Sequence, residues 1–207
     1  MLTALEAFKR LQEGNRRFVA NQTTAEPIDR AHRAALAAGQ EPFAIILGCS
    51  DSRVPAELVF DQGFGDLFVI RVAGNIVAPS QVGSVEFAAS RFGTQLVVVL
   101  GHSGCGAITA TIEEVTGQAT SQSRNLRSIV DRVRPSVETL ISGRHGHDRE
   151  ALMRDAVRAN VRASVNHLRH GSALLEQLSR SAGLKVLGAE YSLETGVVTF
   201  LDSLAAD

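Results

Sequence analysis

The sequence lacks features that mark several common classes of protein. Its 207 residues include only two cysteines and no tryptophan. Two cysteines cannot form the disulfide framework of a small secreted domain, and a single disulfide is not expected in a reducing compartment. No apolar run approaches the roughly 20 residues of a membrane-spanning helix, and the N-terminus lacks the apolar core and cleavage site of a signal peptide. We therefore expect a cytoplasmic protein with no membrane partner.

An excess of charge of either sign is also missing. The chain has 21 basic and 22 acidic residues, for a net charge of −1, and it contains no long run of like charges. Nothing in this balance indicates a nucleic-acid partner. A hydrophobic content of 44% excludes a disordered chain. We expect one domain over residues 1–207, made of an N-terminal helical arm (1–39), a core with the candidate metal ligands (40–110), and a helical region with terminal strands (111–207).

Short apolar segments alternate with helical ones in the first half of the chain. The segments at 43–48, 67–72 and 96–101 are rich in β-branched residues and almost wholly apolar, which is typical of strands buried on both faces of a parallel sheet. Helical segments that begin near Pro55 and Ser80 separate them. The order predicts an α/β fold, with a mostly parallel, doubly wound sheet and flanking helices.

The N-terminal arm is expected to contain two helices. The residues "TALE" at 3–6 form a capping box that opens an amphipathic helix. Asp29 is expected to begin a second helix, which stops at Gly39.

The second half of the chain is mostly helical in pattern. An apolar stripe with helical spacing covers 126–141, and Pro135 is expected to interrupt that helix. A valine stripe at 157–165 indicates another helix. The segments 184–191 and 197–202 are typical of a terminal strand pair, which would add a C-terminal antiparallel strand to the sheet.

The two cysteines and one histidine follow two of the predicted strands. Cys49 lies in "LGCSDSR", directly after the first strand, and "GHSGCGA" places His102 and Cys105 after the third. In doubly wound sheets, neighbouring carboxyl ends of strands form the ligand crevice. Thiolates with an imidazole favour zinc, and three protein ligands leave a fourth position open. The arrangement therefore predicts a zinc site, although a buried thiol pair alone would be the simpler interpretation of the cysteines.

The motifs "CSDSRV" and "GHSGCGA", together with residues 59–75 between them, resemble the β-class carbonic anhydrases. The resemblance is close over residues 40–110 and looser elsewhere. It implies the β-carbonic anhydrase fold and one Zn²⁺ per chain on Cys49, His102 and Cys105. It also implies reversible hydration of carbon dioxide to bicarbonate and a proton by zinc-bound hydroxide. A homodimer or tetramer is implied as well, with the N-terminal helix packed on a partner.

The resemblance also assigns roles around the metal. Asp51 and Arg53 would form the family's catalytic pair, in which Asp51 either binds Arg53 or moves onto the zinc as a fourth ligand. Three residues would bind substrate. Gln40 would reach a partner's pocket across a dimer interface, the backbone N–H of Gly106 would hold bicarbonate, and Phe68 would line the pocket for carbon dioxide.

The chain departs from the family pattern at two places. Phe87 stands where many relatives have tyrosine, so a phenol is lost there. Some relatives regulate themselves through a bicarbonate pocket of Trp, Arg and Tyr. Arg71 and Tyr191 match two of those positions, but Ile46 occupies the tryptophan position and cannot donate the indole hydrogen bond. We therefore expect little bicarbonate inhibition, and we interpret Arg71 and Tyr191 as packing or interface residues.

Three other functions are compatible with the same residues. A hydrolase of carbonyl sulfide or carbon disulfide would use the same zinc motif, a non-enzymatic zinc-binding protein would have a closed site, and a redox protein would use the two thiols. The remaining candidate ligands are histidines that we interpret as solvated loop and helix residues: His145, His147, His167 and His170.

Overall fold

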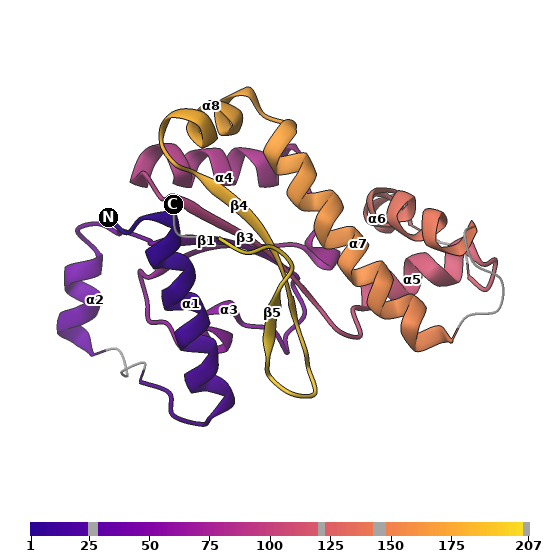
Figure 1. The fold of residues 1–207 in the computed structure, drawn as a ribbon, viewed down its shortest axis with the longest axis horizontal. Coiled ribbons are helices and arrows are strands. Elements are labelled where there is room, and N and C mark those ends of the chain that lie inside the picture. Colours follow the sequence, from indigo (N-terminus) through magenta and orange to yellow (C-terminus); the bar gives the residue numbers. More distant parts are fainter. Residues whose placement is uncertain (25–28, 120–122, 143–147, 205–207) are drawn as a thin grey trace.

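Figure 1 shows a computed structural model of the chain, which describes residues 1–24, 29–119, 123–142 and 148–204. One five-stranded sheet with the order β2-β1-β3-β4-β5 runs through the centre. The first four strands are parallel, and the last is antiparallel to β4. The strands are β1 (Ala44–Gly48), β2 (Leu67–Arg71), β3 (Leu96–His102), β4 (Lys185–Tyr191) and β5 (Val198–Phe200). The predicted fold class is confirmed, including the antiparallel C-terminal strand.

Helices cover both faces of the sheet (Figure 1). Ile46 and Val98 point toward a core shared with α1 (Ala4–Val19) and α3 (Ala56–Val59). Ile45 and Val97 point toward a core shared with α4 (Pro79–Phe92), α7 (Arg149–His170) and α8 (Ala173–Ser181). None of the helices in the described ranges combines the length and apolar character that crossing a membrane requires. The helices are α1 (Ala4–Val19), α2 (Arg30–Leu36), α3 (Ala56–Val59), the 3-10 helix η1 (Ala73–Asn75), α4 (Pro79–Phe92), α5 (Gly106–Val115), α6 (Arg124–Ser142), α7 (Arg149–His170) and α8 (Ala173–Ser181).

The N-terminal helix α1 packs on its own chain. The predicted capping box is present, with the Thr3 side chain accepting from the Glu6 backbone. Phe8 and Leu11 are buried in the core beneath the sheet. The buried Asn15 side chain donates to the Val59 carbonyl at 3.0 Å and accepts from the Val198 N–H at 2.8 Å. The apolar face of α1 is therefore buried within its own chain, so its burial does not require the partner on which the resemblance would pack this helix.

Helix α7 lies unusually close to the sheet because two strands present glycine to it. A Cβ atom on Gly101 would lie 2.5 Å from Val161 Cγ2, and one on Gly188 would lie 2.8 Å from Val161 Cγ1. Both distances are far below van der Waals contact. Because Gly101 and Gly188 have no side chain, Val161 packs directly against the strands there. This contact brings α7 to the end of β3 that carries His102.

Helix boundaries differ from the predictions at three places. Helix α6 continues through Pro135, because that side chain faces solvent while Val133 and Val137 are buried on the opposite face. Burial of this face outweighs the loss of one backbone hydrogen bond. Helix α4 begins one residue before Ser80, with Pro79 at the first helical position. Helix α2 begins after Asp29 as predicted but ends before Gly39.

Candidate metal centre

The three predicted ligands meet at the carboxyl ends of neighbouring strands. Cys49 directly follows β1, His102 is the last residue of β3, and Cys105 precedes the first turn of α5. The ligand atoms all lie within 4.8 Å of one another, and the three residues are buried. Gly104, with φ of 62°, makes the tight turn that returns the chain from His102 to Cys105. The order of the strands in the sheet thus brings together residues that are more than 50 positions apart in the sequence.

The imidazole of His102 presents an unused nitrogen to this cluster. Its Nδ1 lies 2.9 Å from the Ser103 carbonyl oxygen, and because a carbonyl only accepts, Nδ1 carries the proton. The other nitrogen, Nε2, is buried without a hydrogen-bond partner among the described residues. A buried, unpartnered acceptor whose ring is oriented by a backbone carbonyl has the arrangement of a metal-ligating histidine. The residues therefore fit a zinc ion.

The thiols of Cys49 and Cys105 influence one another strongly. The contact with Cys105 lowers the pKa of Cys49, although burial opposes this shift, and contacts with His102 and the Gly74 N–H lower it further. Contact with the Cys49 sulfur, followed by burial, raises the pKa of Cys105. Cys49 thus readily forms a thiolate, and a second thiolate at Cys105 is disfavoured beside it. A cation between the two sulfurs is needed to stabilise both thiolates.

Protonation of His102 also competes with a metal. Burial would lower the pKa of this ring, but contacts with the Cys49 sulfur and the Ser103 carbonyl outweigh burial, and the net shift is upward. Protons therefore compete with a metal ion for Nε2, so metal affinity should fall as the pH falls.

Asp51 lies beside the cluster and is held by Arg53. The guanidinium donates from Nε to Oδ1 at 2.9 Å and from Nη2 to Oδ2 at 2.7 Å, and the Arg53 backbone N–H donates to Oδ1 at 3.0 Å. Asp51 Oδ2 lies 3.8 Å from His102 Nε2. The Arg53 side chain holds the pKa of Asp51 well below its usual range, so the carboxylate is an anion at neutral pH. Both oxygens of this carboxylate therefore accept from Arg53.

Arg71 and Tyr191 contact the backbone of the same loops. Arg71 donates from Nε to the Cys49 carbonyl at 3.0 Å and from Nη2 to the Asp51 carbonyl at 2.6 Å. The buried Tyr191 pairs with His102 in the sheet, and its carbonyl accepts from the Ser103 N–H at 2.9 Å. These contacts agree with the interpretation of both residues as structural.

The predicted substrate residues lie at three separate places. Gly106 is the first residue of α5, where backbone N–H groups have no acceptor within the helix. Phe68 belongs to an aromatic cluster, with ring centroids 6.2 Å from Phe87 and 6.1 Å from Phe92. Gln40 lines a hollow of about 570 Å³ with Phe64, and none of the three ligands lines it. Within one chain, the structure therefore does not bring Gln40 to the metal cluster.

The remaining histidines do not form a second metal site in the ranges that the structure describes. His167 and His170 are exposed on α7, and Cys49, His102 and Cys105 form the only ligand group found there. His145 and His147 lie outside the described residues.

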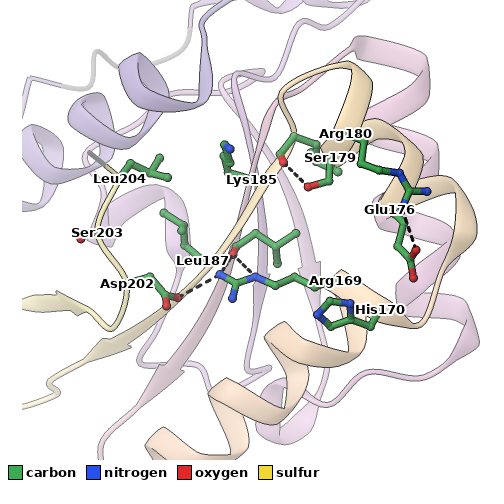
Figure 2. A pocket seen from close by; sticks show the side chains of 12 residues that line it. Arg169, His170, Glu176, Ser179, Arg180, Lys185, Leu187, Asp202, Ser203 and Leu204 are labelled. Atoms are coloured by element: carbon green, nitrogen blue, oxygen red, sulfur yellow. Dashed lines mark hydrogen bonds and ion pairs between the residues drawn. The ribbon is translucent and has the colours of Figure 1, made fainter. Parts of the chain in front are cut away.

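A hollow of about 420 Å³ lies at the opposite end of β4, beside Lys185 (Figure 2). Its charged side chains are largely paired. Arg169 donates to the Val186 carbonyl and lies 3.5 Å from Asp202, and Arg180 lies 3.4 Å from Glu176. These pairings leave little unbalanced charge to attract an ion, and we assign this hollow no role.

Sequence reasoning missed a second layer of residues around the metal cluster. The Gly74 N–H donates to Cys49 Sγ at 3.3 Å, and Asn160 and Ser164 of α7 bind the backbone of the same turn. The sequence pattern does contain one indication of these residues. Asn160 and Ser164 lie one helical turn apart, on the face of α7 that otherwise presents valine.

Comparisons with known proteins point to one family. A family model described as carbonic anhydrase matches residues 44–198. Carbonic anhydrase 2 of Mycobacterium tuberculosis is 39% identical over 200 residues, which cover 96% of this chain and 93% of that protein. The carbonic anhydrase of Mycolicibacterium smegmatis is 37% identical over 93% of this chain and 90% of its own length.

Solved structures agree with the sequence comparisons. The β-carbonic anhydrase CcaA superposes with a TM-score of 0.70 at 28% identity and covers 94% of this chain and 95% of its own. The β-carbonic anhydrase CafA of Aspergillus fumigatus has a TM-score of 0.75 over 96% of this chain and 92% of its own; at 23% identity it supports the fold alone.

Proposed function

This chain belongs to the β-carbonic anhydrase family and is a carbonate dehydratase, and we propose that it works through one zinc ion held by Cys49, His102 and Cys105. The reaction is the reversible hydration of carbon dioxide to bicarbonate and a proton. The observation that carries the zinc assignment is the buried His102 Nε2, which has no hydrogen-bond partner in the part of the chain that the structure describes and lies within 4.8 Å of two cysteine sulfurs. Thiolate and imidazole ligands are those that zinc prefers.

The protein residues position the reactants around that centre. When bound, a zinc ion would supply the Lewis acidity that makes hydroxide available near neutral pH. Asp51 Oδ2 would accept a hydrogen bond from the attacking group and orient it, and Arg53 holds the carboxylate in place through two charge-assisted hydrogen bonds. Because Arg53 engages both oxygens of Asp51, the carboxylate would not serve as a fourth ligand. A site with three protein ligands favours an enzyme over a closed, purely structural zinc site.

Three residues would bind the substrate: Gly106, Phe68 and, from a partner, Gln40. The N–H of Gly106, at the positive end of α5, would hold a bicarbonate oxygen. Phe68 would provide apolar surface for carbon dioxide. No observation favours the sulfur-containing analogues or a redox role for the cysteines.

Gln40 can reach a metal centre only in an assembly, so we propose a homodimer as the minimal active unit. Large apolar side chains are exposed in the single chain, with Phe64 64% and Phe87 55% accessible. Exposed apolar surface of this kind marks contact surfaces. The tetrameric β-carbonic anhydrases of Sordaria macrospora have the same fold, and a tetramer built from such dimers is compatible with this proposal. We further propose that the protein works in the cytoplasm.

Stopped-flow carbon dioxide hydration on protein of measured zinc content tests the function directly. We expect about one zinc per chain and a rate that scales with zinc content. Asn166→Ala, a change at an exposed position of α7, serves as the control and should match the parent. Fully zinc-loaded parent protein that does not accelerate hydration between pH 6 and 9 would overturn the proposal.

A further inference from the structure

The turn between β2 and α4 has a backbone that needs outside support. Gly74 has φ of 70° and ψ of 19°, and the next residue, Asn75, has φ of 43°. Two consecutive residues in the left-handed region are uncommon, and the second is not a glycine. Such a conformation persists only when surrounding contacts hold it.

This turn touches all three segments that carry the metal ligands. The Gly74 N–H donates to Cys49 Sγ at 3.3 Å. A Cβ on Gly74 would lie 3.0 Å from Ala107 Cβ, close to Cys105 in the chain. A Cβ on Gly101, next to His102, would lie 3.7 Å from Asn75 Oδ1. The position of the turn therefore affects every ligand.

Two buried polar side chains of α7 hold the turn. Asn160 Nδ2 donates to the Gly74 carbonyl at 2.8 Å, and Ser164 Oγ donates to the Asn75 carbonyl at 3.0 Å. Asn160 is 2% exposed and Ser164 is 5% exposed. Burying an amide and a hydroxyl is costly unless each finds a partner. Both partners here are carbonyls of a turn whose neighbouring N–H binds a ligand sulfur.

We propose that Asn160 and Ser164 are positioning residues of the metal centre, which fix the Gly74–Asn75 turn so that the Gly74 N–H binds the Cys49 sulfur. The inference rests on the proposed zinc site. It adds to that site two residues of α7, which support the ligands without binding the metal. Residues that orient metal ligands through hydrogen bonds typically change metal affinity by about 10- to 100-fold when they are removed.

Asn160→Ala tests the proposal, with Asn166→Ala as the matched control on the same helix. The first change removes a buried donor, whereas the second removes an exposed amide. We measure zinc affinity by competition with a chromophoric chelator and record the cobalt–thiolate charge-transfer band of the Co²⁺-loaded proteins. Asn160→Ala should bind zinc about 10- to 100-fold more weakly and shift the band, and Asn166→Ala should match the parent in both.

Ser164 supplies a second test in case Asn160→Ala does not fold. Ser164→Ala removes the hydroxyl, and Ser164→Thr restores it. We expect weaker zinc binding in the first and recovery in the second.

The outcomes separate this inference from the proposed function. Parental zinc affinity and an unshifted cobalt band in Asn160→Ala, or equal affinities in Ser164→Ala and Ser164→Thr, would overturn the positioning role while leaving the zinc site intact. A parent protein that binds no zinc would overturn the zinc site itself, and the positioning role with it.

Discussion

Substitution of Gly101 by alanine should damage both the sheet and the metal centre. The new methyl group would lie 2.5 Å from Val161 Cγ2 and 3.3 Å from Val157 Cγ1. Carbon atoms at rest are roughly 3.5–4.0 Å apart, so either α7 or the end of β3 must move by about an ångström. Because His102 is the next residue, a shift of β3 also displaces a metal ligand.

The size of the effect follows from this overlap. Insertion of a methyl group into a packed core costs about 1–3 kcal/mol. For a chain of this length, each 1 kcal/mol lowers the melting temperature by about 2–4 °C. The zinc-free Gly101→Ala protein should therefore melt about 2–12 °C below the parent, and its zinc affinity should fall as well.

Two further variants show whether the contact with Val161 is the cause. Gly48→Ala is the matched control, since Gly48 precedes Cys49 as Gly101 precedes His102, but its added Cβ would meet only the Leu100 carbonyl at 3.9 Å. It should stay within about 0.5 kcal/mol of the parent. Val161→Ala removes the obstructing methyl groups, so the double variant should lose less stability than the two single variants together.

Urea unfolding of all four zinc-free variants measures these free energies. Strict additivity of Gly101→Ala and Val161→Ala would refute the reasoning, because it would mean that the two side chains do not meet. A Gly101→Ala protein as stable as the parent would refute it as well.

Other predictions concern the metal and its neighbours. Cys49→Ala should lose most of its zinc and activity together, because an incomplete ligand set binds the ion weakly; full zinc occupancy by mass spectrometry would contradict the ligand assignment. Arg53→Ala should keep its zinc but lose about 10- to 100-fold in hydration rate, because Asp51 loses both side-chain donors; a parental stopped-flow rate would show that the guanidinium is not needed. The pKa of Asp51 is lowered by Arg53, so the stability from this pair is fully present above the unfolded value of about 3.9 and is lost as the pH falls further. The difference in melting temperature between zinc-free parent and Arg53→Ala should therefore be constant from pH 8 to 5 and shrink below about pH 4; a decrease that begins above pH 5 would contradict this. Bicarbonate should inhibit hydration little, since Ile46 is an apolar core residue with no side-chain donor; cooperative inhibition that Arg71→Ala abolishes would show that a regulatory site is present.

The sheet could be predicted because its signal is local. The segments at 43–48, 67–72 and 96–101 are apolar and β-branched over their whole length, and β1 and β3 are buried throughout. The prediction that Pro135 interrupts the helix was wrong because it considered the missing N–H of proline and not the burial of the opposite helix face. That burial depends on how α6 packs against its neighbours, which the local pattern does not contain.

The ligands could be predicted because residue type and strand position together are informative. Cys49 and His102 each stand at the end of a buried strand, and parallel strands bring their ends to the same edge. Asn160 could not be found in this way, since its hydrogen bond to Gly74 spans 86 residues. The bond depends on how closely α7 packs on the sheet at Gly101 and Gly188, and the spacing of residues along the sequence does not reveal such packing.

The long sequence separation of these contacts also affects the order in which the parts of the site form during folding. Cys49, His102 and Cys105 have left the ribosome well before residues 160 and 164 are synthesised, and the hydrogen bonds that complete their surroundings cross 86 and 89 residues. Contacts of such long sequence separation form late, because closing a long loop costs entropy before it gains any contact. In a nascent chain, the two thiols and the imidazole therefore emerge before α7 can supply the hydrogen bonds that complete their surroundings.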